Sequence, residues 1–156
     1  MSSSDKIDVA DAVGKLNALL ERAAQDEEVV DYLYSWTDRA EKFEPADREA
    51  LAKSCIAGFE RYPAVDWLGN PGPLIHFIDE AIPTLDATLE LAIESLKRQP
   101  SFYVIYIVRR ALNTVERDAP PTLLQLCQEA EATLQSVAES SDVDEQLRVA
   151  AREFLD

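Results

Sequence analysis

Ser101-Phe-Tyr-Val-Ile-Tyr-Ile-Val108 is the stretch that decides the fold, because its residues suit either a buried strand or a buried helix. Aromatic and β-branched side chains favour a strand. However, the run continues without a glycine or proline into Arg109-Arg-Ala-Leu-Asn-Thr-Val115, and an unbroken run of that length is more typical of a helix. We therefore predict a helix that Pro100 opens. Because this helix is apolar on nearly every side, we expect it to lie at the centre of the core.

Helical periodicity extends through the rest of the chain. Apolar residues recur at spacings of three and four, and Ser, Asp or Pro precedes each periodic run. Tyr62-Pro63 ends the third run, and the short links between runs favour antiparallel neighbours. The sequence thus predicts an all-α fold of about eight helices in antiparallel hairpins, either a HEAT-like array or an irregular helical bundle. The expected helices run from Ser4 to about Ala24, from Asp26 to Phe43, from Pro45 to Phe59, from Pro73, from Pro83 to Leu96, from Pro100, from Pro120-Pro121 to Val137 and from Asp142 to Phe154.

Length and charge set limits on what the chain can bind. Its 156 residues, 47% of them hydrophobic, suit one domain with a single core, so we expect residues 1–156 to form a single helical domain. The chain carries 30 acidic and 15 basic residues, a formal net charge of −15. This excess repels nucleic acid and anionic membranes, because binding to phosphate needs a positive surface. We therefore expect a basic protein partner, no nucleic acid and no membrane.

The sequence shows no basic start followed by an apolar run and no apolar stretch of about 18 residues, so we expect a cytoplasmic protein. Cys55 and Cys127 each lie within an apolar helical pattern, which favours two buried free thiols. A disulfide or a reactive thiol is the alternative. No Cys-x-x-Cys or Cys/His spacing indicates a metal or redox site, and we expect no cofactor.

The segment Trp67-Leu-Gly-Asn-Pro-Gly-Pro-Leu-Ile-His-Phe-Ile-Asp-Glu80 contains two of the four glycines and the single histidine. Gly69-Asn-Pro-Gly72 is typical of a tight turn, and it lacks the following lysine and hydroxyl of a phosphate-binding loop. His76, Asp79 and Glu80 fall at spacings of three and four, which suits half of a metal site or an acid/base pair. A lone histidine hydrogen-bonded to a neighbour is the other interpretation, which we prefer because the chain has no second histidine. No Gly-x-Ser-x-Gly motif is present, and we predict no enzymatic activity.

Four carboxylates form a stripe on the second predicted helix, opposite its apolar face. Solvation alone is one explanation of such a stripe. The net charge of −15 favours a docking surface instead, because excess like charge opposes compactness and serves mainly solubility or the attraction of a cationic partner. Tyr32, Tyr34 and Trp36 are candidate aromatic anchors. The stripe consists of Glu27, Asp31, Asp38 and Glu41, with Tyr34 between them. The apolar face of the same helix consists of Val29, Val30, Leu33, Trp36, Ala40 and Phe43. A similar acidic ridge on the first helix consists of Asp5, Asp8 and Asp11.

Three segments resemble a pattern in small helical immunity proteins of bacterial polymorphic toxin systems, of the contact-dependent, Rhs or type VI secretion type. They are Trp67–Glu80, Leu91–Pro100 and Val108–Asn113. Immunity proteins of this kind are made beside a secreted toxin and neutralise it inside the producing cell. The resemblance implies a non-enzymatic protein that binds a cognate toxin domain and blocks its active site or substrate path. We place the predicted contacts on the acidic first two helices, and a second group at Asp66, Asp79 and Glu80 near the turn.

Two alternatives come from other classes of protein. One is a small helical enzyme or metal-binding protein that uses His76 with Asp79 and Glu80. The other is a helical adaptor for another protein. If the immunity interpretation holds, the acidity of the chain favours a nuclease as the toxin, although phospholipases, deaminases and ADP-ribosyltransferases also have basic surfaces.

Overall fold

Helices make up the regular structure that the computed structural model describes, in residues 8–68 and 72–155. The ambiguous run forms a helix, as predicted. No strand occurs in these two ranges, so the predicted all-α fold class is confirmed. The elements are α1 (Val9–Ala23), the short 3₁₀ helix η2 (Glu27–Val29), α2 (Val30–Ala40), α3 (Pro45–Arg61), α4 (Gly72–Ala81), α5 (Leu85–Arg98), α6 (Phe102–Thr114), α7 (Pro121–Glu139) and α8 (Glu145–Leu155).

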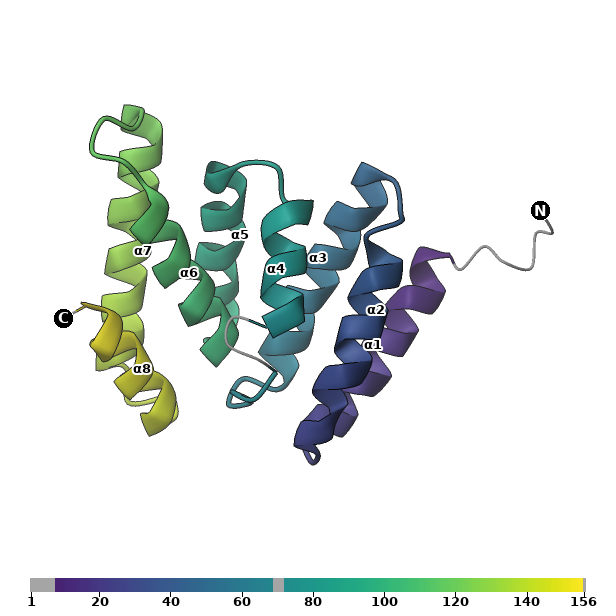
Figure 1. Ribbon diagram of the computed structural model, residues 1–156. Coiled ribbons are helices and arrows are strands. Elements are labelled where there is room, and N and C mark those ends of the chain that lie inside the picture. Colours follow the sequence, from purple (N-terminus) through teal and green to yellow (C-terminus); the bar gives the residue numbers. More distant parts are fainter. Residues whose placement is uncertain (1–7, 69–71, 156) are drawn as a thin grey trace.

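The described α-helices pair in chain order into four antiparallel hairpins, which stack side by side (Figure 1). The first helices of the hairpins, α1, α3, α5 and α7, contact one another in turn and form one layer. In the other layer α2 contacts α4, and α6 contacts α8. The hairpins α1–α2 and α7–α8 therefore lie at opposite ends of the stack (Figure 1). This stack of antiparallel hairpins agrees with the predicted all-α arrangement.

One core runs along the whole stack, and each α-helix contributes at least one large side chain to it that is less than 2% exposed. Because apolar residues at spacings of three and four share one face of a helix, this burial explains the periodicity of the sequence. Helix α6 contacts α3, α5, α7 and α8, in agreement with its predicted place in the core. The fully buried side chains include Leu16, Leu33, Leu51, Phe77, Leu89, Ile105, Leu134 and Leu147.

Local signals in the sequence set several helix starts where we predicted them. Asp26 precedes η2, and its carboxylate accepts a hydrogen bond from the amide of Glu28 at 2.9 Å. Pro45 and Pro121 occupy the first turns of α3 and α7. A proline is tolerated there because the amides of a first turn have no partner within the helix.

Other helix starts differ from the prediction by a few residues. The predicted cap Ser4 lies outside the described residues, and the carboxylate of Asp8 instead accepts a hydrogen bond from the amide of Asp11 at 2.8 Å. Thr84 and Ser101 cap α5 and α6, although the proline before each of them was expected to open the helix. Their hydroxyl groups accept hydrogen bonds from amides of the first turn, which a proline side chain cannot do.

The starts of α4 and α8 also needed correction. Helix α4 begins at Gly72, one residue before Pro73, and Gly72 has a φ of +84°, a left-handed conformation that glycine adopts without strain. Asp142 does not cap α8, which begins only at Glu145. The amide of Asp142 donates to the hydroxyl of Ser140 at 3.3 Å, so Asp142 belongs to the turn that precedes the helix.

The segment between α3 and α4 is bonded to three other helices. The indole Nε1 of Trp67 donates to a carbonyl at the end of α1, that of Ala23, at 2.6 Å. The amide of Leu68 donates to the hydroxyl of Tyr103 in α6, also at 2.6 Å. The carbonyl of Pro63 accepts from the first amide of α6 at 2.8 Å, and that of Ala64 accepts from a side chain of α8 at 3.1 Å. These bonds give partners to backbone groups of the connecting segment and of the ends of α1 and α6, and they join separate hairpins.

Removal of the Tyr103 hydroxyl tests the importance of this segment. Tyr103 is 3% exposed, so the Tyr103→Phe substitution leaves the buried amide of Leu68 without that acceptor. We expect the free energy of unfolding to fall by about 1–3 kcal/mol. Tyr34→Phe is the matched control, because Tyr34 is 52% exposed and a surface change of this kind shifts stability by at most about 0.5 kcal/mol. Urea unfolding followed by circular dichroism measures the free energy of unfolding of both variants. Equal stability of the two variants would show that the bond between Leu68 and Tyr103 does not stabilise the fold.

Candidate functional site

The four carboxylates of the predicted stripe lie on the exposed side of η2, α2 and the residue that follows α2. Glu27, Asp31, Asp38 and Glu41 are all exposed, and so is Tyr34 between them. We call these five residues the acidic face. Within residues 8–68 and 72–155, none of the four carboxylates is in an ion pair. Direct ion pairs within that part of the chain therefore do not occupy these four carboxylates.

The opposite side of α2 is buried, as the periodicity predicted. Val29, Leu33 and Ala40 are at most 1% exposed, and Phe43 is partly buried against the same core, whereas Val30 is of intermediate exposure. Burial of this side fixes the rotation of the helix about its axis. The acidic face must then point away from the core, because it lies half a helical turn from the buried residues.

The structure separates the three predicted aromatic anchors. Tyr32 and Tyr34 are 55% and 52% exposed and remain candidates for contact with a partner. The prediction for Trp36 is wrong, since this side chain is only 5% exposed. Its indole Nε1 donates to the carbonyl of Ala12 in α1 at 2.9 Å, and its ring packs edge-on against Phe77 in α4. Trp36 thus connects the first hairpin to the second and is a structural residue.

The second group of predicted contacts does not form one surface of free carboxylates. Asp66 is exposed in the segment between α3 and α4, and Asp79 and Glu80 are exposed near the end of α4. The carboxylate of Asp79 accepts a hydrogen bond from the guanidinium of Arg110 at 2.7 Å, so it is already paired. This contact between α4 and α6 also raises the pKa of Arg110. Asp66 and Glu80 make no ion pair within the described ranges.

His76 lies exposed on the same side of α4 as Asp79 and Glu80. Its predicted hydrogen bond to a neighbour is absent from the part of the chain that the structure describes. The described residues also include no group of three or more His, Cys, Asp or Glu side chains with the geometry of a metal site. The carboxylate of Asp79 is paired with Arg110, and no hydrogen bond or ion pair between His76 and a carboxylate occurs among the described residues.

Both cysteines are free thiols, and they differ in burial. Cys55 in α3 is 0% exposed, as predicted, whereas Cys127 in α7 is only partly buried. Helix α8 has 11 residues against 19 in α7, so it covers the second part of α7 more completely than the first. Burial raises the pKa of both thiols, and the nearby carboxylates of Glu131 and Asp86 add to the shift at Cys127. Protonated thiols are poor nucleophiles, which disfavours the reactive-thiol alternative.

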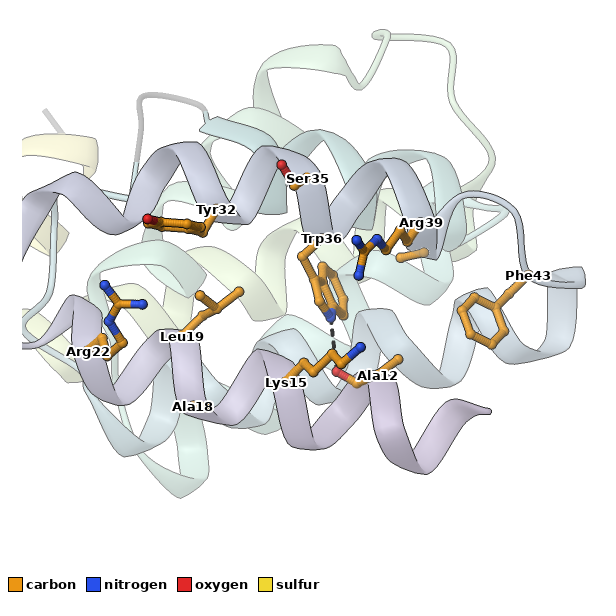
Figure 2. A pocket seen from close by; sticks show the side chains of 11 residues that line it. Ala12, Lys15, Ala18, Leu19, Arg22, Tyr32, Ser35, Trp36, Arg39 and Phe43 are labelled. Atoms are coloured by element: carbon orange, nitrogen blue, oxygen red, sulfur yellow. Dashed lines mark hydrogen bonds between the residues drawn. The ribbon is translucent and has the colours of Figure 1, made fainter. Parts of the chain in front are cut away.

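A groove of about 340 Å³ between α1 and α2 is the feature that the sequence interpretation missed (Figure 2). Its floor contains Leu19 and the indole of Trp36. At one end the guanidinium of Arg22 lies over the ring of Tyr32, with 5.1 Å between the guanidinium carbon and the ring centroid. Phe43 closes the other end (Figure 2). The groove therefore joins an apolar floor to a positively charged rim.

The spacing of the lining residues is the signal in the sequence for this groove. On each of the two helices four of the lining residues fall at i, i+3, i+4 and i+7, which places them on one side of the helix, and Ala12 and Ala40 extend these two sets. The two sets are Lys15, Ala18, Leu19 and Arg22 on α1, and Tyr32, Ser35, Trp36 and Arg39 on α2.

Thiol labelling tests the difference between the two cysteines. In the folded chain we expect Cys127 to react with an aromatic disulfide reagent more slowly than free cysteine, and faster as the pH rises, because its pKa is raised. Cys55 should react only after unfolding in urea, and Cys127→Ser should remove the reaction of the folded chain. Fast labelling of Cys55 in the folded chain would show that α3 is not packed as described.

Comparisons with known proteins do not place the chain in a family. No family model matches it, and neither the curated proteins nor the solved structures contain a match. None of the helices in the described ranges combines the length and the apolar character that a membrane span needs. The proposals below therefore rest on the geometry and charge of the described residues, and on the resemblance of three sequence segments.

Proposed function

We propose that the chain is a protein-binding module that docks a basic protein through the acidic face of α2. The observation that carries this proposal is the set of four exposed, unpaired carboxylates on one side of a helix whose other side is buried. Like charges held so close together repel one another, and a cationic partner relieves that repulsion. Charge of this kind also steers the partner toward the surface before contact.

The two exposed tyrosines supply the apolar part of the proposed contact. Tyr34 lies within the acidic face, and Tyr32 lies beside it at the edge of the groove. Tyrosine side chains are common among the residues that dominate binding energy at protein interfaces. We expect Tyr34 to pack against the partner while the surrounding carboxylates bind its Lys and Arg side chains.

A stable interface needs more surface than α2 alone offers. Interfaces of ordinary size bury about 800 Å² on each partner. Helix α4 lies beside α2 in the same layer of the stack (Figure 1), and its exposed side carries Glu80. We therefore expect the partner to extend from the acidic face onto α4, with Glu80 at the margin. Asp79 takes a smaller part because Arg110 already occupies its carboxylate.

For the identity of the partner, we propose a cognate toxin domain, which makes the chain an immunity protein that acts in the cytoplasm of the producing cell. Support comes from the resemblance of Trp67–Glu80, Leu91–Pro100 and Val108–Asn113 to immunity proteins, and from the acidity of the chain. The described parts of these segments belong to the middle of the stack, and Trp67 and the Asp79–Arg110 pair hold helices together there. In this proposal the resemblance marks the scaffold, and the acidic face makes the contact that covers the active site or substrate path of the toxin.

Charge reversal on the acidic face tests the proposal. The Asp31→Lys, Asp38→Lys double variant should associate with the toxin domain encoded beside this chain at least tenfold more slowly at low salt, because steering raises association rates by roughly 10 to 1000-fold. The association rate of the wild-type chain should fall as salt rises, since the screening length shortens to about 8 Å at physiological ionic strength. Stopped-flow fluorescence across a salt series measures both effects.

A matched control separates the acidic face from net charge. Asp118→Lys with Glu153→Lys makes the same change in net charge at two exposed positions away from α2. We expect this control to keep most of the wild-type association rate. It should also protect cells that express the toxin, whereas the Asp31→Lys, Asp38→Lys variant should protect them less. Equal slowing by the two double variants would contradict the assignment of the acidic face, and a failure of the wild-type chain to protect cells would contradict the immunity function.

A further inference from the structure

We propose that the groove between α1 and α2 is a second binding site, which takes an acidic amphipathic helix of a partner protein. This site goes beyond the proposed function, because its charge is opposite to that of the acidic face and its ligand differs. It does not depend on whether the partner of the acidic face is a toxin.

Positive charge is concentrated at this groove. Lys15, Arg22 and Arg39 line it, and no carboxylate among the described residues does so. Within those residues none of the three cations is in an ion pair with a carboxylate. In a chain with a formal net charge of −15, a groove with only cations on its rim is a local reversal of sign. Charge complementarity therefore selects an anionic ligand.

The floor of the groove selects a ligand that is also apolar. Leu19 and Trp36 contribute to the floor, and the hydrogen bond from Trp36 to the carbonyl of Ala12 holds the indole in place. The Arg22 guanidinium lies over the exposed ring of Tyr32 at one end of the groove. Because the indole of Trp36 is buried and hydrogen-bonded, this part of the floor loses little conformational entropy when a ligand binds.

The length and spacing of the groove fit a helix. Lys15 and Arg22 are seven residues apart on α1, about 10.5 Å along the helix axis, and Ala18 and Leu19 lie between them. A bound helix with carboxylates at i and i+7 and apolar residues at i+3 and i+4 matches this pattern along its length. Recognition of an amphipathic helix by an apolar groove is a recurrent mode of peptide binding.

None of the residues in the ranges 8–68 and 72–155 covers the groove, so its position in that part of the chain leaves it open to a partner. It is formed by the hairpin α1–α2 at one end of the stack, and its lining residues come from α1, α2 and the turn after α2 (Figures 1 and 2). Terminal units of stacked helical arrays usually present a polar outer side, so an apolar groove there calls for a covering ligand. A second copy of the chain is disfavoured, because two molecules that each carry a net charge of −15 repel one another.

Fluorescence anisotropy with two synthetic helical peptides tests the site. One labelled peptide carries Glu at i and i+7 with Leu at i+3 and i+4, and the other carries Lys in place of Glu. We expect the acidic peptide to bind the full chain and the basic peptide to bind this site at least tenfold more weakly. Arg39→Glu should weaken binding of the acidic peptide about tenfold. Rising salt should weaken binding of the acidic peptide to the wild-type chain, because it screens the charges on both partners.

Two further variants separate the groove from general charge and from loss of folding. Ala18→Phe fills the groove from an exposed position on α1, so it should abolish binding of the acidic peptide without changing the thermal unfolding curve. Arg117→Glu makes the same charge change as Arg39→Glu at an exposed position between α6 and α7, and it should leave the affinity within about twofold of wild type.

Three outcomes would overturn the proposal. The first is that the acidic peptide does not bind, or binds Ala18→Phe as tightly as the wild-type chain. The second is displacement of the bound peptide by dodecanoate at comparable concentrations, which would indicate a site for a small amphiphile. The third is a dimer in sedimentation experiments that Ala18→Phe dissociates, which would assign the groove to a second copy of the chain.

Discussion

The hydrogen bonds of the segment between α3 and α4 are the constraint on which the rest of the structure depends. Hairpins in a stacked array contact mainly their neighbours, so their relative orientation depends on a few contacts between them. Trp67 binds the end of α1, Leu68 and Pro63 bind α6, and Ala64 accepts a hydrogen bond from α8. One short segment thus connects its own hairpin to each of the other three. Gly69, Asn70 and Pro71 of the predicted tight turn, which follow this segment, lie outside the described residues.

With the hairpins fixed in this way, α2 presents two surfaces of opposite charge on adjacent sides. The acidic face, with Tyr34 among its carboxylates, points away from the core. The groove, with Tyr32 at one end and Arg39 on its rim, opens between α2 and α1. Burial of Leu33 and Trp36 sets the rotation of α2 and therefore the direction of both surfaces. A change in this packing would displace the two proposed sites together.

Sequence alone predicted what depends on local signals. The helices follow from apolar periodicity and from caps such as Asp26, and the exposed side of α2 follows from its spacing. Contacts between distant residues were not predictable in this way. The Asp79–Arg110 pair joins residues 31 positions apart, and the partners of Trp36 are the carbonyl of Ala12, 24 positions away, and the ring of Phe77. The groove escaped prediction because each helix supplies only half of it, and only their pairing shows that the two halves meet.

Carboxyl footprinting of the complex tests the central claim most directly. The free chain and its complex with the basic partner are treated with a carbodiimide and an amine, and mass spectrometry measures the modification of each carboxylate. The account predicts that modification of Asp31 and Asp38 falls in the complex, while that of Asp118 is unchanged. Unchanged modification of the acidic face, together with protection of Glu90 and Glu94 on α5, would contradict it and move the binding surface to the other layer of the stack.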